Sequence, residues 1–278
     1  MKRSTGNTAA IEEFVRLKPG CEKPRKQRRG RMVRATLYLC RIELLKTFRN
    51  QYFIWPSLFW PLLFYFIYTD VVAVPNRYGG VRWAAFFLMS MASFSILAQS
   101  LSGLSLRFAQ EKESGWARRL WITPLPRGGH LLSKIFAQMV LNAFILLFIF
   151  LAGAVVNGVR LPVEAWIGCF VWLWSGGLTF MALGLFIGMA ANAQLSNALT
   201  NVLYLGLALA GGLWTPLPYL PKALQAIGVW LPSFRYGDGA WRLLSGEAPS
   251  AMDIGLLVVY FLIFVVLSIY SLARKKEG

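Results

Sequence analysis

Six apolar runs, each close to the length of a membrane-spanning helix, constrain this chain more than any other feature of its sequence. A bilayer core of about 30 Å is crossed by roughly 20 consecutive apolar residues in a helix. The six runs cover residues 52–74, 83–106, 135–156, 166–190, 195–213 and 254–273. Hydrophobic residues make up 56% of the chain, which is more than a soluble domain of this length can bury. The sequence therefore predicts an all-α, polytopic membrane protein with six transmembrane helices.

Lysine and arginine are distributed unequally between the two sides that six spans create. Residues 1–51, 107–134 and 274–276, which fall on one side, hold 14, 6 and 3 of the 29 Lys and Arg, and the other side holds the remaining six. Because basic loops stay in the cytoplasm, we expect both termini and residues 107–134 to be cytoplasmic and the protein to lie in the cell membrane. This assignment requires an even number of spans. The turn at residues 191–194 carries no charge, and if the runs on either side of it formed a single re-entrant element, the number of spans would be odd.

The formal net charge of +17 would also suit a protein that binds nucleic acid. Membrane topology accounts for most of this charge, and contact with anionic lipid is a further use for it, so we predict a lipid bilayer and no nucleic acid among the partners. Residues 1–32 are basic and polar and are expected to form a disordered cytoplasmic tail. The transmembrane domain is expected to cover residues 33–278.

An amphipathic helix is predicted directly after this tail, over residues 33–48. The apolar side chains that recur there at helical spacing, on one face, are Val33, Leu37, Cys40, Leu44 and Phe48. Arginines flank this stripe, where long side chains can reach the lipid headgroups. We expect the helix to lie in the membrane interface, and the alternative is a cytosolic helix packed against another part of the protein.

Proline and glycine give three of the runs particular features. Pro56 and Pro61 should kink the first run, since a proline inside a helix removes a backbone hydrogen bond. Glycines recur in the fourth and fifth runs, at positions 176, 177, 184, 188, 206, 211 and 212. Small residues let helix backbones approach closely in lipid, so we expect these two spans in the interior of the bundle.

The segment 214–253 is interrupted by prolines too often for a spanning helix and is too apolar for a free loop. Pro221 suits the first position of a short helix, and Ser233 is suited to cap a second one over residues 234–244. Two short re-entrant helices before the last span are the favoured prediction, and a lid on the surface is the alternative.

The sequence lacks the residues that ion-coupled carriers, zinc sites and P-loop ATPases require. No charged residue or histidine lies within the apolar runs, apart from their ends, whereas ion-coupled carriers need ionisable groups there. Three cysteines and one histidine cannot form a zinc site, and there is no P-loop motif for ATP hydrolysis. We therefore expect a chain that is not an enzyme and that holds no metal or cofactor of its own.

The polar residues inside the runs are uncharged. They are Gln99, Ser100 and Ser102 in the second run, Asn142 in the third, and Thr200 and Asn201 in the fifth. Such side chains are typical of hydrogen bonds between helices in a membrane. Four of them, Gln99, Ser102, Thr200 and Asn201, are also the candidates for lining a substrate pathway.

Residues 107–134 form a long charged segment between two of the runs. The segment contains six Lys and Arg, the two acids Glu111 and Glu113, and a Pro-Leu-Pro turn at residues 124–126. A short helix stopped by these prolines would be a rigid projection that transmits movement to the second and third spans. The simpler alternative is a solvated, positively charged loop.

This segment resembles the permease subunits of ATP-binding-cassette exporters of the ABC-2 type, a group that includes drug-export permeases. Those proteins typically carry the pattern E-x-E-x-G-x-x-x-x-L-x-x-T-P-L after their second span. The residues that match it here are Glu111, Glu113, Gly115, Leu120, Thr123, Pro124 and Leu125. A second match is the stretch GGLWTPL at residues 211–217, and the resemblance extends over residues 33–274.

The resemblance implies a coupling helix that docks on a separate cytoplasmic ATPase subunit, which would bind the ATP and Mg²⁺. The contact surface would lie around Trp116–Leu125, with Glu111 and Glu113 at the cytoplasmic end of the second span. Two permease chains, identical or different, are also implied, with the substrate route between their first, second and fifth spans. The residues that would close the outer end of this route are Trp214, Pro216, Pro218 and Pro221.

We therefore expect the membrane-spanning permease subunit of an exporter that moves an amphipathic or lipid-like molecule outward, using ATP hydrolysed by its partner. A membrane scaffold or assembly protein without transport activity is the alternative. It would have the same topology but would need no ATPase partner.

Overall fold

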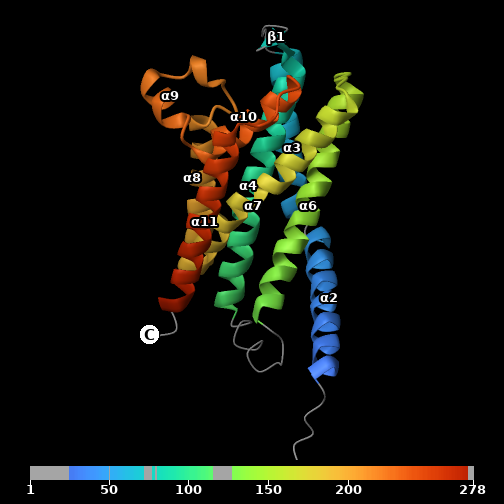
Figure 1. The fold of residues 1–278 in the computed structure, drawn as a ribbon, viewed down its shortest axis with the longest axis vertical. Helices are drawn as coiled ribbons and strands as arrows, with labels where there is room; N and C mark the ends of the chain where they lie inside the picture. Colours follow the sequence, from blue (N-terminus) through green and yellow to red (C-terminus); the bar gives the residue numbers. More distant parts are fainter. Residues whose placement is uncertain (1–24, 50, 72–76, 79, 115–126, 275–278) are drawn as a thin grey trace, which may run out of the picture.

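The computed structural model describes residues 25–49, 51–71, 77–78, 80–114 and 127–274, and this part of the chain is almost entirely helical (Figure 1). The helices are α2 (Arg25–Arg49), α3 (Gln51–Phe66), α4 (Trp83–Glu113), α6 (Arg127–Val156), α7 (Val163–Ala190), α8 (Ala193–Ala210), α9 (Lys222–Gly228), α10 (Pro232–Leu244) and α11 (Ala251–Arg274). The remaining elements are the π-helical turn η1 (Ile67–Val71), the 3₁₀ turn η2 (Leu217–Tyr219) and the short strands β1 (Arg77–Tyr78) and β2 (Val81–Arg82).

Helix α4 lies at the centre of the bundle. It packs against α3, α6, α7, α8 and α10, and it is buried along most of its length. Up to Leu106 its side chains are apolar or small, apart from Gln99, and Phe87, Met91 and Leu97 are almost inaccessible to solvent. A helix that is apolar all round is suited to enclosure by the rest of a protein. The other helices are therefore arranged around α4, and contacts at its two ends reach several of them at once.

Glycines bring α7 into direct contact with α4, as the sequence predicts for the fourth span. A methyl group added at Gly184 or Gly188 would overlap the backbone carbonyl oxygens of Leu101 and Ser105 on α4. The fifth span, helix α8, behaves differently, because no atom of the described residues lies near an added methyl group at Gly206 and half of the helix residues are exposed. Only one face of α8 packs on the rest of the chain, so the predicted interior position is wrong for its other face.

Four helical stretches are long and apolar enough to cross a membrane, judged by length and composition among the described residues. They are α4, residues 129–156 of α6, α7, and residues 251–271 of α11, and they coincide with four of the predicted spans. The first predicted span corresponds to α3 and η1, and the fifth corresponds to α8, a helix of 18 residues. A multi-pass, all-α membrane protein is thus confirmed, while the number of six spans stays a prediction.

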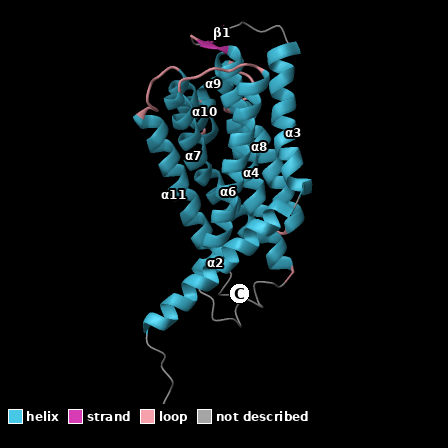
Figure 2. Ribbon diagram, turned by 90° about the vertical axis from the view of Figure 1, so that its right-hand side faces the viewer, coloured by secondary structure: helices cyan, strands magenta, loops and turns pink. Residues whose placement is uncertain are grey.

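The two ends of the bundle carry different elements. We name the end with α2 and the last residues of α11 the terminal end, and the opposite end, with the β1–β2 hairpin, α9 and α10, the hairpin end (Figure 1). Helix α2 crosses the terminal end obliquely and packs along α6 (Figure 2). It begins at Arg25 rather than at residue 33, because the Lys, Arg and Gln residues at its start are good helix formers. Residues 1–24 of the predicted tail lie outside the described residues.

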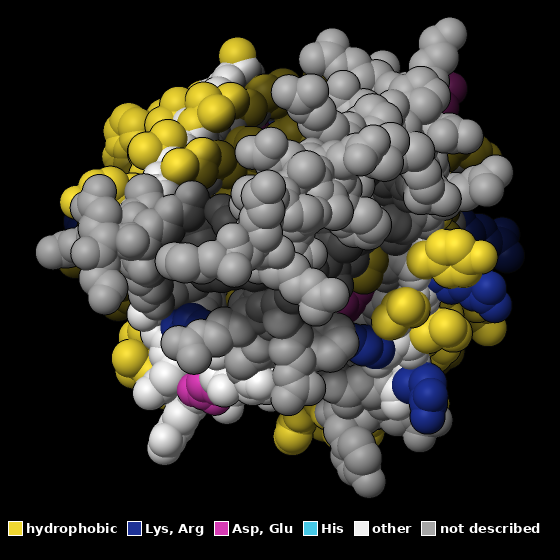
Figure 3. Space-filling view, turned by 90° about the horizontal axis from the view of Figure 1, so that it is seen from below, with side chains coloured by type: hydrophobic (Ala, Val, Ile, Leu, Met, Phe, Trp, Pro, Cys, Tyr) yellow, Lys and Arg dark blue, Asp and Glu magenta, His cyan; other side chains and the backbone are white. Residues whose placement is uncertain are grey.

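The side of α2 that faces the bundle is partly polar, because Glu43 and Thr47 lie there beside the half-buried Leu39, Cys40 and Leu44. Glu43 and Thr47 are buried, whereas the apolar side chains of Leu37, Tyr38 and Ile42 are exposed. Figure 3 looks onto the terminal end and shows Lys and Arg side chains beside apolar ones on this face. Exposed apolar side chains next to basic ones are typical of a helix at a membrane interface.

The predicted pair of short helices before the last span is present as α9 and α10. Helix α10 packs against α4, α7, α8 and α11, and its fully buried Tyr236 donates a hydrogen bond to the Leu173 carbonyl oxygen at 2.5 Å. The predicted cap is wrong, because α10 begins at Pro232 and the Ser233 hydroxyl donates to the Leu207 carbonyl oxygen of α8 at 2.6 Å. Pro232 presets the backbone of the first turn, so the helix starts without a side-chain cap.

The β1–β2 hairpin has no counterpart among the predicted elements. Arg77 pairs with Arg82 and Tyr78 with Val81 in antiparallel register. Gly80 in the turn has a φ of 82°, a conformation that glycine adopts at little cost. The Gly-Gly pair at residues 79–80 is the sequence signal for such a turn, since two-residue hairpin loops favour glycine.

Candidate functional site

A buried group of charged side chains joins three helices at the terminal end. Lys134 of α6 is 1% exposed, and its ammonium lies 2.5 Å from the Glu111 carboxylate of α4 and 3.4 Å from the Glu43 carboxylate of α2. The same ammonium lies 5.5 Å from the centre of the Phe108 ring. A buried charge is costly unless it is paired, and Lys134 has an acidic partner on each of two neighbouring helices.

Two further side chains complete what we call the terminal cluster, which consists of Glu43, Arg107, Glu111, His130 and Lys134. The His130 Nε2 atom lies 3.0 Å from the second oxygen of Glu111. Arg107 Nη1 and His130 Nδ1 are buried, and neither has a hydrogen-bond partner among the described residues. Buried polar atoms without partners are costly, so these two atoms are the positions at which the cluster can take further hydrogen bonds.

The last residues of α4 also hold the connection between α7 and α8. The Lys112 ammonium donates to the Ala191 carbonyl oxygen at 2.5 Å, directly after α7 ends. The Glu113 carboxylate accepts from the backbone N–H of Ala193 at 2.8 Å, where α8 begins. A cation at the end of a helix and an anion at the start of the next are both favoured by the helix dipoles.

These contacts fix both helices that flank the predicted coupling segment. Glu111 and Glu113 lie in the last turn of α4, at the terminal end, and both carboxylates bond to other parts of the same chain. The remaining predicted coupling residues, Gly115, Trp116, Leu120, Thr123, Pro124 and Leu125, lie outside the described residues. The segment 115–126 is therefore attached at each end to a helix whose position is set by charged contacts.

A polar network lies inside the bundle between α4 and α6. The Asn142 amide donates to the Ser100 hydroxyl at 2.8 Å and accepts from the Gln138 amide at 3.1 Å. Gln138 also donates to the backbone oxygen of Gln99 at 3.3 Å. The predicted hydrogen bonds between helices are confirmed for Ser100 and Asn142. In hydrocarbon such bonds help to hold two helices together.

The four predicted pathway residues lie on α4 and α8, which pack against each other. Gln99 and Thr200 are buried within the chain, and the Thr200 hydroxyl donates to the Ser196 carbonyl oxygen of its own helix at 2.8 Å. Ser102 and Asn201 are partly exposed. Within one chain, therefore, Ser102 and Asn201 are the two of these residues that another molecule can reach.

The predicted gate residues gather at the hairpin end. Trp214 packs between Phe64 of α3 and Phe94 of α4, with ring centres 5.5 and 5.3 Å from its own. Pro221 directly precedes α9, which begins at Lys222 and has no side-chain cap, so the helix starts one residue after the predicted position. These contacts tie the stretch after α8 to the two helices beside it.

A cavity of about 360 Å³ lies beside this stretch, and Pro216 and Pro218 form part of its wall. Tyr78 of the hairpin and Trp241 of α10 supply aromatic surface, and Asp238 of α10 supplies a carboxylate. Among the described residues, no three His, Cys, Asp or Glu side chains lie close enough together to hold a metal ion, here or elsewhere.

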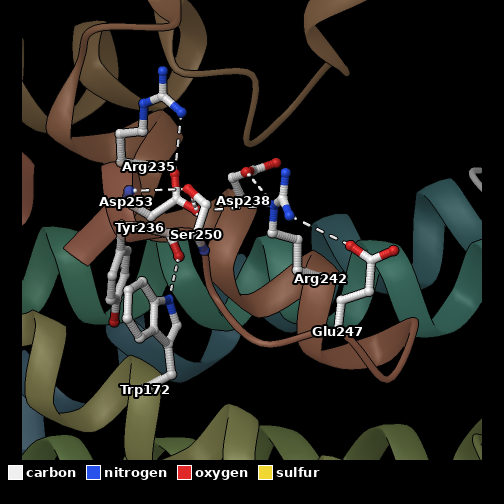
Figure 4. Close-up of polar contacts among 8 residues, drawn as sticks. All are labelled: Trp172, Arg235, Tyr236, Asp238, Arg242, Glu247, Ser250 and Asp253. Atoms are coloured by element: carbon white, nitrogen blue, oxygen red, sulfur yellow. Dashed lines mark hydrogen bonds and ion pairs between the residues drawn. The ribbon is translucent and has the colours of Figure 1, made fainter. Parts of the chain in front are cut away.

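Charged contacts tie α10 to α11 at this end (Figure 4). The fully buried Asp253 of α11 lies 3.1 Å from Arg235 of α10. Its carboxylate accepts from the backbone N–H of Ser250 at 2.9 Å, and its own N–H donates to the Ser250 hydroxyl at 3.1 Å. This reciprocal pattern is a capping box, which satisfies the backbone N–H groups of Ser250 and Asp253 at the start of α11.

The second charged group of α10 is centred on Arg242, which lies 3.1 Å from Asp238 and 3.4 Å from Glu247 (Figure 4). Burial raises the pKa of the Asp238 carboxyl, and the hydrogen bond from Arg242 offsets only part of this effect. The same hydrogen bond raises the pKa of Arg242. Burial likewise raises the pKa of Tyr78 on the other side of the cavity.

Glu43, His130 and Lys134 are members of the terminal cluster that the sequence does not identify as site residues. Glu43 is the one acid in the sequence of the basic helix α2, and His130 is the one histidine of the chain. Lys134 lies directly before an apolar run. These are weak signals in the sequence, because each side chain gains its role only from a partner on another helix.

Comparison with known proteins agrees with this architecture. The family model of the ABC-2 family transporter protein matches residues 53–270, which extend from α3 to the last turn of α11. The chain is also 38% identical over 238 residues to the "Putative transport permease YvfS" of Bacillus subtilis (strain 168), and the alignment covers 85% of this chain and 96% of that protein. The chain therefore belongs to the ABC-2 family of transporter proteins.

Proposed function

We propose that this chain is the permease subunit of an exporter powered by a separate ATPase subunit, and that it moves an amphipathic or lipid-like molecule out of the cell. The proposal rests on how the two helices on either side of the segment 115–126 are bonded to the rest of the chain. This segment joins the central helix α4 to α6, and charged contacts connect both helices to the rest of the terminal end. Such an arrangement suits a point at which an external subunit drives the bundle.

A subunit docked on this segment would act on several helices at once. The terminal cluster joins α4 and α6 to α2, and Lys112 and Glu113 join α4 to the α7–α8 turn. Breaking a buried ion pair costs several kcal/mol, about 3–5 for the loss of one partner, so these helices resist being moved separately. Closure of ATPase subunits would therefore displace the terminal end of the bundle as a unit.

The proposed docking surface comprises Gly115, Trp116, Leu120, Thr123, Pro124 and Leu125. Glu111 and Glu113 have a different role in this proposal, because their carboxylates are already bonded within the chain. They are positioning residues that set the direction in which the segment leaves α4. ATP and Mg²⁺ are held by the partner subunit.

Six spans with both termini in the cytoplasm fit this function. Residues 51–71 of α3 and η1 would reach about 30 Å at the rise of 1.5 Å per residue of a regular helix, and α8 would reach almost as far. The exposed apolar side chains of α2 support its position in the membrane interface. The enclosure of α10 by four helices supports a re-entrant position for it between the last two spans.

A second permease chain is needed to complete the substrate route. The outward face of α8 contains Asn197, Ala198 and Gly206 beside leucines and valine, all exposed in the single chain. Polar and small residues within a membrane are typical of contacts between helices rather than of contacts with lipid. We therefore place the route between the α3, α4 and α8 helices of two chains, with Ser102 and Asn201 accessible to the substrate and Trp214 and its prolines at the outer end.

The proposal is tested by replacing Trp116 with Asp and purifying the protein from its native membrane in a mild detergent. We expect the wild-type chain to retain a soluble ATPase and the variant to lose it, because an acid disrupts an apolar docking contact. Wild-type complexes should hydrolyse ATP and export substrate from vesicles, while the variant should be inactive in both assays.

Trp230→Asp provides a matched control, since this tryptophan is exposed at the hairpin end. It should keep the ATPase. Purification of the wild-type chain without any nucleotide-binding partner would contradict the proposal and favour the scaffold function.

A further inference from the structure

A second cavity at the hairpin end, of about 140 Å³, is lined by three arginines. Arg77 and Arg82 come from the β1–β2 hairpin, and Arg160 comes from the connection between α6 and α7. Small and apolar residues, among them Gly80, Val159 and Leu161, form the rest of the wall. The cavity is thus a small pocket whose charged groups are all positive.

Backbone contacts bring these three side chains together. The Arg82 guanidinium donates to the Gly158 carbonyl oxygen at 3.2 Å, which holds the connection against the hairpin. Gly158 has a φ of 57°, and the next residue, Val159, folds back to donate to the Gly153 carbonyl oxygen of α6 at 3.2 Å. This turn therefore places Arg160 in the wall of the pocket. Arg82 has two roles, because it lines the pocket and also holds the connection against the hairpin.

The positive charge of this pocket is not balanced within the described residues. None of the three arginines has an acidic side chain within ion-pair distance there, and the nearby Asp70 accepts a hydrogen bond from Asn157 instead. Arg77 and Arg82 are also directly opposed in the hairpin register, where like charges destabilise a strand pair. All three arginines are exposed, so a molecule from outside can reach them, and a bound anion would reduce the repulsion between Arg77 and Arg82.

The position of the pocket indicates where that anion comes from. Membrane-crossing helices begin or end beside it, at Trp83, Val156 and Val163, so it lies near the level of the lipid headgroups. Val155, Val156 and Val163 are 73%, 63% and 70% exposed in the single chain, as expected for side chains that face acyl chains. A molecule that has both a phosphate group and a hydrocarbon chain would fit here, with the phosphate in the arginine pocket and the hydrocarbon along these valines.

We propose that this arginine pocket binds the phosphate of a phospholipid headgroup in the leaflet at the hairpin end. Arginine suits this ligand because its planar guanidinium forms paired hydrogen bonds with phosphate oxygens. The volume admits a phosphate group and excludes drug-sized molecules, whose pockets measure roughly 300 Å³ or more. The pocket shares Val81 with the larger cavity beside Pro216, but the two have no charged residue in common.

The test uses the full chain purified in a neutral detergent and titrated with three probes: phosphatidylglycerol, a glycolipid with the same acyl chains but no phosphate, and inorganic phosphate. Native mass spectrometry measures the bound lipid, and calorimetry measures inorganic phosphate. We expect retention of phosphatidylglycerol and not of the glycolipid. Arg77→Gln and Arg160→Gln should each weaken phosphatidylglycerol binding roughly tenfold, because each removes one charge-assisted contact.

Lys222→Gln removes a positive charge from the same end without touching the pocket, and it should leave lipid binding unchanged. Arg160→Lys keeps the charge but loses the paired geometry, so its affinity should fall between those of the wild type and Arg160→Gln; it also remains informative if the glutamine variants unfold. Equal lipid binding by the wild type and the pocket variants would overturn the proposal. Binding of inorganic phosphate without phosphatidylglycerol would overturn the lipid source and assign the pocket to a free anion.

Discussion

Lys134 is the residue on which the terminal cluster most depends, because it is the partner shared by Glu43 and Glu111. Replacing it by Met keeps a similar apolar stem but leaves two largely buried carboxylates without their lysine. We expect a loss of about 3–5 kcal/mol of stability, as found when one partner of a buried ion pair is removed. Thermal unfolding of the purified protein in detergent measures this loss.

The matched variant for this measurement is Lys222→Met, which removes an exposed lysine at the start of α9. Surface substitutions usually change stability by less than about 0.5 kcal/mol. If both variants unfold at the same temperature, the terminal cluster does not contribute to stability and its role in holding three helices together is refuted.

Asp238 and Asp253 are two acids of the hairpin end that should respond differently to removal of their charge. Burial raises the pKa of Asp238 in the folded protein, so the folded state binds this proton more tightly than the unfolded chain. The contribution of Asp238 therefore makes the protein more stable as the pH falls through the raised pKa towards the ordinary value of 3.8. Asp238→Asn should remove this pH dependence and cost about 1 kcal/mol or less at neutral pH.

Asp253→Asn should cost more, about 2–4 kcal/mol at neutral pH, since it weakens the capping box of α11 and leaves Arg235 without its charged partner. Unfolding temperatures of both variants over a range of pH values make the comparison. An Asp238→Asn protein whose stability still rises as the pH falls in the same window would show that another group is responsible.

At the scale of the helix, the contact between α4 and α7 depends on the absence of a side chain at Gly184. The added methyl group of Gly184→Ala would overlap the Leu101 carbonyl oxygen, a backbone atom that cannot turn aside. We expect the helices to separate slightly, at a cost of about 1–3 kcal/mol, as for other overpacked interiors. The measurement is the unfolding temperature in detergent.

The same substitution at Gly255 of α11 is the control, because in the part of the chain that the structure describes no atom lies within 4 Å of an added methyl group there. Gly255→Ala should stabilise its helix by about 0.5–1 kcal/mol, since alanine loses less backbone freedom than glycine. Equal changes in unfolding temperature for Gly184→Ala and Gly255→Ala would contradict the explanation that the glycine at position 184 allows α4 and α7 to pack closely.

At the scale of the whole molecule, the exposed face of α8 allows a test of whether two chains associate. Val202 lies on this face and Val259 lies on the exposed surface of α11. In a background with the three native cysteines replaced by serine, Val202→Cys should form a cross-linked dimer in membranes on oxidation. Val259→Cys, which we expect to face lipid, should remain monomeric on a denaturing gel.

Dimers at Val259 but not at Val202 would place the second chain on the other side of the bundle. Cross-links at neither position would favour a single permease chain. In both cases the proposed route between the α8 helices would have to be abandoned.

Several structural features could be predicted from the sequence because they depend on local stretches. A membrane helix satisfies its backbone hydrogen bonds within itself, so length and apolar composition were enough to locate α4, α6, α7 and α11. The glycines of the fourth span predicted its close packing, and the prolines after α8 predicted two short helices. The cap at Ser233 was wrong because the hydroxyl found a partner on α8, which no local pattern could reveal.

The sequence by itself thus determined that this chain crosses the membrane several times, that it has no P-loop of its own, and which family it resembles. Only the tertiary structure decided which helix is central, which face of α8 remains exposed, and how the charges are paired. Lys134 and Glu43 lie 91 residues apart, and Arg82 contacts a backbone oxygen 76 residues away. Such contacts depend on how complete helices and turns pack, and side-chain spacing along the chain contains little information about that packing.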